Sequence, residues 1–165
     1  MKRNQVFHET LIPLLVEGIG AESYLELGTH GNETIGKVKC ARRYGVDLHV
    51  GTPTDMALFE MTTDHFLEHF AAAYSPYDFV FIDADHAAEQ VKKDFLGVWP
   101  HVSPEGLVAL HDSNPETAKD AEPGYCGNAW EFAEWLHHRN YEAMTLPYCP
   151  GLTIVRKRCV WGPTG

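Results

Sequence analysis

The sequence lacks the features of a membrane or nucleic-acid-binding protein. No apolar stretch approaches the roughly 18 residues of a membrane span, and the apolar run near the start is broken by His8, Glu9 and Pro13. The chain has only 13 basic residues but 23 acidic ones, which gives a formal net charge of -10. This charge disfavours broad electrostatic contact with nucleic acid or an anionic membrane. We therefore expect a cytoplasmic protein with no nucleic-acid or membrane partner.

Cysteine motifs, repeats and linkers are also lacking. Cys40, Cys126, Cys149 and Cys159 form no C-x-x-C pair, so a zinc site or redox motif has no support and reduced thiols are expected. Cys126 and Cys149 could pair in an oxidising compartment, of which the sequence gives no sign. With 165 residues, 44% hydrophobic and 22% charged, the chain is typical of one globular domain.

Short apolar runs alternate along the chain with amphipathic segments. Strands are predicted at 24–27, 45–49, 57–61, 78–82, 107–110, 141–146 and 152–156. Helices are predicted at 4–18, 32–43, 64–74, 86–98 and 128–139. Pro13 is expected to kink or split the first helix. The alternation predicts an α/β, Rossmann-like, seven-stranded and mostly parallel sheet with helices on both faces, and the short "LPYCPG" link predicts an antiparallel C-terminal hairpin.

The predicted domain covers the whole chain, 1–165. We expect an N-terminal helical cap over 1–20, a core over 21–158 and a tail over 159–165. The polar segment 113–128, which contains two prolines, is expected to be the most mobile part.

The stretch "YLELGTHGNETIG", residues 24–36, places an acid and two glycines where the first strand ends. Glycines let the backbone approach a ligand closely, and a helix start presents free N–H groups. Glu26 would repel a pyrophosphate but suits a ligand with hydroxyls or a positive charge. The stretch also lacks the G-x-G-x-x-G spacing of dinucleotide-binding turns, so a nicotinamide dinucleotide is disfavoured.

Acids also occur at other strand ends. Asp47 belongs to the second predicted strand, "FIDADH" ends the fourth and "LHDSN" ends the fifth. Because the carboxyl ends of parallel strands share one rim, these acids should converge. Asp47 follows Glu26 by 21 residues, about one strand–helix–strand unit, where a carboxylate can bind both hydroxyls of a ribose. The spacing predicts a nucleoside ligand.

With these motifs the chain resembles the class I S-adenosylmethionine (SAM)-dependent methyltransferases over roughly 24–157. The first turn of that family usually reads E-x-G-x-G-x-G; this sequence matches it at Glu26 and Gly28 and departs from it at His30 and Asn32. The spacing E-x-G-x-x-G is similar to that of the branch that includes macrolide-sugar O-methyltransferases and cephalosporin-hydroxylase-like proteins.

The resemblance implies SAM as the cofactor. It places Asp47 at the ribose, Glu26 near the methionine ammonium and the "EMTTDHF" stretch beside the adenine. The cofactor-binding set that it implies is Glu26, Gly28, Thr29, His30, Gly31, Asp47, Thr62, Thr63, Asp64 and Asp83.

"FIDADH" resembles the "FIDADK" of catechol-type, metal-dependent O-methyltransferases, and "HDSN" takes the place of their second acidic pair. The resemblance implies a divalent ion, Mg²⁺, held by Asp83, Asp112 and Ser113, which offer the oxygen ligands that magnesium accepts. Such an ion lowers the pKa of a bound hydroxyl. His86 stands where the catechol-type enzymes have a lysine base, and a histidine can accept a proton at neutral pH.

Each residue also has a simpler interpretation. The glycines could merely turn the chain, and Asp83, Asp85 and Asp112 could cap helices or be solvated. His86 could simply belong to the first turn of its helix. His111 is expected to point away from the rim, since successive strand residues alternate faces.

The sequence thus predicts a methyltransferase that acts on a hydroxyl of a small molecule, such as a sugar or phenol, with metal assistance. A homodimer is compatible with it. The alternative is a catalytically silent SAM-binding or interaction module. A nicotinamide-dependent reductase, a third option, is disfavoured by the first turn.

Overall fold

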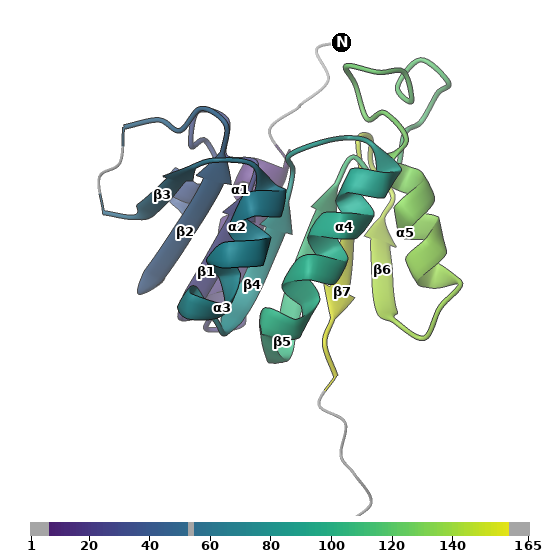
Figure 1. Ribbon diagram of the computed structural model, residues 1–165. Helices are drawn as coiled ribbons and strands as arrows, with labels where there is room; N and C mark the ends of the chain where they lie inside the picture. The colour runs from purple at the N-terminus through teal and green to yellow at the C-terminus, as the bar shows by residue number, and fades with distance from the viewer. Residues whose placement is uncertain (1–6, 53–54, 159–165) are drawn as a thin grey trace, which may run out of the picture.

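The fold is one seven-stranded sheet, which the computed structural model describes over residues 7–52 and 55–158. The strands are β1 Ser23–Leu27, β2 Arg42–Asp47, β3 Ala57–Glu60, β4 Tyr77–Ile82, β5 Val102–His111, β6 Glu142–Leu146 and β7 Leu152–Arg156. They lie in the order β3-β2-β1-β4-β5-β7-β6 (Figure 1). Strands β1 to β5 pair in parallel, whereas β7 is antiparallel to β5 and to β6. The predicted mostly parallel sheet and its antiparallel C-terminal hairpin are confirmed.

Helices lie on both faces of the sheet, as predicted. They are α1 Phe7–Gly18, α2 Thr63–His69, α3 Ala71–Tyr74, α4 Ala88–Val98 and α5 Ala129–His137, with 3-10 turns η1 Ile35–Lys37 and η2 Trp99–His101. In Figure 1, α1 lies behind the sheet and α2 to α5 lie in front of it. Within the described ranges, no helix is both long and apolar enough to span a membrane.

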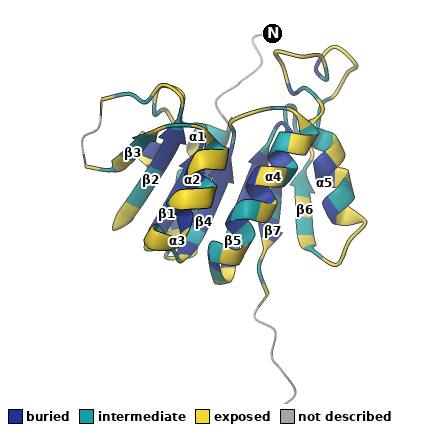
Figure 2. Ribbon diagram, in the orientation of Figure 1, coloured by how far each residue is buried: buried dark blue, intermediate teal, exposed yellow. Residues whose placement is uncertain are grey.

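The sheet separates two apolar clusters. Behind it, α1 packs through Ile12 and Val16 against Tyr24, Phe79 and Phe81 of the central strands. In front of it, alternate residues of the same strands pack against α2, α4 and α5. The central strands are therefore buried on both faces, as Figure 2 shows, and this explains why they read as short continuous apolar runs.

The helix predicted at 32–43 was wrong. Only the three residues of η1 are helical, Val38 is already extended, and β2 begins at Arg42. His30 and Asn32 have positive φ angles of 45° and 66°, which an α-helix does not accept. The turn therefore uses these residues to shape a loop rather than to start a helix.

Two other helices differ in detail from the prediction. The segment 64–74 divides at Phe70, where φ is -122°, into α2 and α3. Pro13 does not split α1, which runs through it, although its ring removes one backbone hydrogen bond. The expected division into cap, core and tail stays a prediction. Residues 1–6, which include the start of the predicted first helix, and the tail 159–165 with Cys159 lie outside the described residues. Cys40, Cys126 and Cys149 are free thiols.

Candidate active site

A cavity of about 760 Å³ opens at the edge of the sheet where β1, β2, β4 and β5 end. The predicted site residues that line it are Glu26, Gly28, Thr29, His30, Asp47, Asp83, His86 and Asp112. An adjoining cavity of about 310 Å³ shares Gly28 and Asp47 with the first and holds the predicted adenine-side residues Thr62, Thr63 and Asp64. The fold therefore brings together acids that are far apart in sequence.

Gly28 is required by the backbone of the neighbouring strand. Its φ angle is +90°, and a Cβ atom there would lie 2.2 Å from the carbonyl oxygen of Asp83. The glycine thus lets the first turn contact the end of β4. Gly31 does not line the cavity, and its amide donates to the Glu33 side chain at 2.9 Å.

Asp47 holds the first turn against β2. Its Oδ2 accepts hydrogen bonds from the amides of Thr29, at 2.9 Å, and His30, at 2.8 Å. Its Oδ1 accepts one from the amide of His49 at 3.1 Å. A carboxylate has about four lone-pair positions, so one remains for a ligand hydroxyl. The expected grip on both ribose hydroxyls therefore requires a change in this turn.

Glu26 is a buried carboxyl group, 1% exposed, on the same face of β1 as Tyr24. Burial raises the pKa of Glu26 well above its ordinary value; the hydrogen bond donated by the Tyr24 hydroxyl opposes this, and the charge of Asp83 reinforces it. Burial thus shifts the balance of this group toward its neutral form. A ligand ammonium in this cavity would stabilise the ionised form.

Asp83, His86 and Asp112 form an acid–histidine cluster whose possible ligand atoms all lie within 4.8 Å of one another. Nε2 of His86 is 3.2 Å from Oδ2 of Asp112, while Nδ1 donates to the carbonyl oxygen of Tyr125. Because a carbonyl oxygen only accepts, Nδ1 carries the hydrogen, and Nε2 is the ring nitrogen that faces the acids.

His111 does not point away from this rim, so that expectation was wrong. Its Nδ1 lies 3.0 Å from Oδ1 of Asp83 and 3.2 Å from Oδ2 of Asp112. Strand alternation fails because Asp112 has a φ angle of 56°, which turns the chain and returns its side chain toward His111. Burial lowers the pKa of His111, but the charges and hydrogen bonds of the two carboxylates outweigh this and raise it to about 10.

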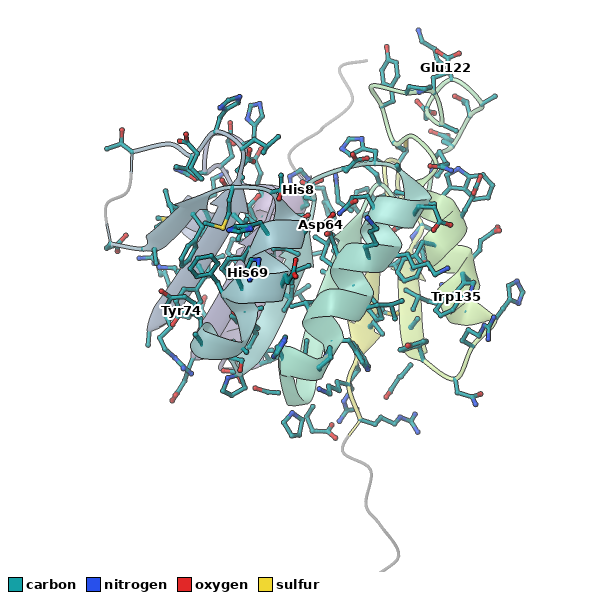
Figure 3. The ribbon with its side chains drawn as sticks, in the orientation of Figure 1. His8, Asp64, His69, Tyr74, Glu122 and Trp135 are labelled. Carbon is teal, nitrogen blue, oxygen red and sulfur yellow. The ribbon has the colours of Figure 1, made fainter. Side chains whose placement is uncertain are left out.

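His8 on α1 was missed. Its ring centroid lies 4.2 Å from that of His111, its Nε2 lies 4.0 Å from Oδ2 of Asp83, and Figure 3 shows it at the edge where the strands end. Burial and the charge of His111 lower the pKa of His8, and Asp83 opposes them. The signal was available: His8 precedes the buried Ile12 and Val16 at helical spacing.

Cys126 was also missed as a site residue. Segment 113–128 rises above the sheet in Figure 1 and lines the cavity with Tyr125 and Cys126. Burial, followed by the charge of Asp112, raises the pKa of the Cys126 thiol to about 12. The thiol therefore stays protonated and hydrogen-bonds the Asp112 carboxylate, which suits a donor rather than a nucleophile.

Ser113, predicted as a metal ligand, and Asp64, predicted to border the adenine, lie apart from the cluster. Ser113 is 7% exposed and lines a different cavity, beside Trp130 and His137 of α5. Asp64 is exposed and accepts from Gln90 at 3.0 Å. The structure therefore brings Asp83 and Asp112 together with His86, but not with Ser113.

A family model described as a methyltransferase domain matches residues 25–113, more than half of the chain. The matched range runs from β1 past the end of β5 and so includes the strand ends that line the cavity. The chain belongs to this methyltransferase family, and the resemblance to the class I SAM-dependent methyltransferases is confirmed.

Named relatives and solved structures agree with this family. Demethylmacrocin O-methyltransferase of Streptomyces fradiae is 37% identical over 62 residues, which are 35% of this chain and 16% of that protein. The MycE methyltransferase of the mycinamycin biosynthetic pathway, solved with Mg, SAH and mycinamycin VI, has a TM-score of 0.63 at 19% identity, covering 87% of this chain and 48% of that one.

The O-methyltransferase TomG from Streptomyces achromogenes, solved with SAM, has a TM-score of 0.63 at 14% identity and covers 92% of this chain and 79% of that one. At such identities the two solved structures support the fold alone. The chain spans less than a fifth of the length of the curated relatives it matches.

Proposed function

We propose that this chain is a SAM-dependent O-methyltransferase that acts on a hydroxyl of a small molecule with the assistance of a divalent metal. The observation that carries the proposal is the division of one cavity into two ends. Glu26 and Asp47 lie at the end formed by β1 and β2, and Asp83, His86 and Asp112 lie at the end formed by β4 and β5.

The first end suits the cofactor. The buried carboxyl group of Glu26 would be ionised by the methionine ammonium of SAM, and the free lone pair of Asp47 would accept from one ribose hydroxyl. The hydroxyl oxygen of Thr29 is buried in the same cavity without a partner among the described residues. The adenine would extend into the adjoining cavity beside Thr62, Thr63 and Asp64.

The second end suits a divalent ion such as Mg²⁺. Asp83 and Asp112 offer the carboxylate oxygens that such an ion accepts, on two neighbouring strands and close enough to share it. A bound ion would supply Lewis-acid chemistry, lowering the pKa of the acceptor hydroxyl. Ser113 remains part of the proposed ligand set only if the chain turns it toward the first cavity.

His86 would be the general base. Its Nδ1 hydrogen bond to the Tyr125 carbonyl holds the ring with Nε2 toward Asp112, at the end where the acceptor would bind. Its Nε2 would take the proton of the acceptor hydroxyl. Bound SAM would supply the methyl group to the acceptor oxygen and would leave as S-adenosylhomocysteine (SAH).

The acceptor class is supported by the curated relatives, which are named as O-methyltransferases of demethylmacrocin and mycinamicin VI. The test is release of SAH from SAM with a panel of sugar-bearing macrolides and catechols, in Mg²⁺ and in EDTA. Turnover that requires both acceptor and metal supports the proposal. Cofactor binding without turnover on any acceptor supports the silent module instead.

We also propose a homodimer. The large apolar side chains of Phe7 and Leu14 on α1 and of Ile19 just after it are 48%, 58% and 45% exposed, and burying them would be favourable. Light scattering of the wild type and of Leu14→Glu tests this assembly. A monomer for both proteins would end the proposal.

A further inference from the structure

His111 is the most enclosed histidine of the acid cluster, and it contacts both carboxylates. We propose that His111 is the positioning residue of the metal site, where its Nδ1–H group holds Asp83 and Asp112 at a spacing that one ion can bridge. This inference rests on the metal part of the proposed function.

The hydrogen bonds fix the direction of donation. Nδ1 of His111 faces Oδ1 of Asp83 at 3.0 Å and Oδ2 of Asp112 at 3.2 Å. Carboxylate oxygens of ionised acids only accept, so Nδ1 must carry the hydrogen, and it shares that hydrogen between the two acids. A shared donor sets the distance between the two carboxylates before any ion binds.

The backbone supports the same arrangement. Ile82 of β4 pairs with Leu110 of β5, so Asp83, which directly follows β4, lies beside His111, the last residue of β5. The positive φ angle of Asp112 then brings its carboxylate back toward the ring. Two acids from different strands thus reach one nitrogen without either strand leaving its register.

The ring itself has little freedom. Its centroid lies 4.2 Å from that of His8 and 6.1 Å from that of Phe81. Nε2 is buried and has no hydrogen-bond partner among the described residues. The polar contacts that orient the ring therefore come through Nδ1, from the two acids.

Burial separates the role of His111 from that of His86. The His111 side chain is 10% exposed, whereas that of His86 is 38% exposed. His111 lines the same cavity but is the less exposed of the two and contacts both acids, so its role is assigned to the ion's ligands rather than to the acceptor. Groups of this kind orient metal ligands in many proteins, and their loss typically costs about 10- to 100-fold in metal affinity.

The test compares Mn²⁺ binding, measured by calorimetry, in the wild type, His111→Leu and His111→Asn. Leucine fills similar space without a donor, whereas the amide nitrogen of asparagine can occupy the position of Nδ1. His101→Leu is the matched control, because His101 directly precedes β5, at the opposite end of that strand from His111. SAH affinity and the thermal midpoint are measured for each protein to confirm that it is folded.

We expect His111→Leu to lose about 10- to 100-fold in Mn²⁺ affinity, with SAH affinity unchanged, and His111→Asn and His101→Leu to stay near the wild type. Equal or tighter Mn²⁺ binding by a folded His111→Leu would show that His111 only neutralises the acids, and would overturn the inference. If the wild type binds SAH but no Mn²⁺, the metal part of the proposed function fails, and the inference fails with it.

A measurement on the wild type remains decisive if His111→Leu does not fold. In protein with ¹⁵N-labelled histidine, we expect an Nδ1-bound proton, absent from His111→Asn, that is protected from exchange with and without Mg²⁺. Rapid exchange of that proton in both states would overturn the inference.

Discussion

Asp94 of α4 gives a prediction whose size follows from the structure. Its side chain is fully buried, and its Oδ1 accepts a hydrogen bond from Gln90 at 3.0 Å. Burial raises the pKa of Asp94 from its ordinary 3.8 to about 6. We therefore expect Asp94→Asn, which keeps an oxygen toward Gln90 and carries no charge, to stabilise the fold at neutral pH.

The sign and magnitude follow from linkage. A folded-state pKa above the unfolded one means that stability is greatest below about pH 4, where Asp94 is protonated in both states, and is lost as the pH rises toward about 6. Each pKa unit of difference between the folded and unfolded states corresponds to about 1.36 kcal/mol of unfolding free energy. The difference of about two units for Asp94 therefore corresponds to about 3 kcal/mol. For a chain of this length that corresponds to a rise of about 6 to 12 °C in Tm for the variant at neutral pH.

The assay is urea unfolding of the wild type and Asp94→Asn between about pH 4 and pH 8. Glu89→Gln, an exposed change on the same helix, is the control. We expect the two stabilities to be close near pH 4, to diverge up to about pH 6 and to run parallel above it. A variant that is no more stable than the wild type at about pH 8 would refute the reasoning about this buried acid.

The remaining predictions concern the cavity. Asp47→Ala should weaken SAH binding by about 10- to 100-fold, since one hydrogen bond to a charged group contributes about 1.5 to 3 kcal/mol; unchanged affinity in a folded variant would remove Asp47 from the site. Gly28→Val should lower the thermal midpoint sharply because its Cβ would meet the Asp83 carbonyl at 2.2 Å; a wild-type midpoint would show that the turn can move. His86→Ala should reduce turnover by about 10²- to 10⁴-fold while sparing SAH affinity, and full activity would place the base elsewhere. Chelation with EDTA should likewise lower turnover, and full turnover in EDTA would end the metal proposal.

The centre of the sheet was predictable because its central strands are buried on both faces. Runs such as 78–82 and 152–156 carry enough apolar and β-branched residues to be recognised alone. Once the strands are parallel, the meeting of Asp83 and Asp112 follows from their position just after two strand ends. The absence of a helix at 32–43 was not predictable from the apolar spacing, because the positive φ angles in the turn prevent a helix that this spacing would allow.

The finer contacts of the site depend on geometry that the sequence does not display. His111 was misplaced because the alternation rule assumes an extended residue at Asp112, where the chain has a φ angle of 56°. His8 joins the site only because α1 packs across the ends of β4 and β5. The three amides that bind Asp47 come from the turns on either side of β2, and strand spacing alone cannot reveal them.

The most direct measurement of the central claim is a calorimetric titration of SAH into the chain, with and without Mg²⁺. The proposed cofactor end predicts one saturable site in both conditions, because Glu26 and Asp47 belong to β1 and β2 whereas the proposed metal ligands follow β4 and β5. It also predicts that the affinity falls in Asp47→Ala and is kept in His86→Ala. No saturable binding of SAH, or binding that Asp47→Ala leaves unchanged, would contradict the assignment of this cavity to SAM.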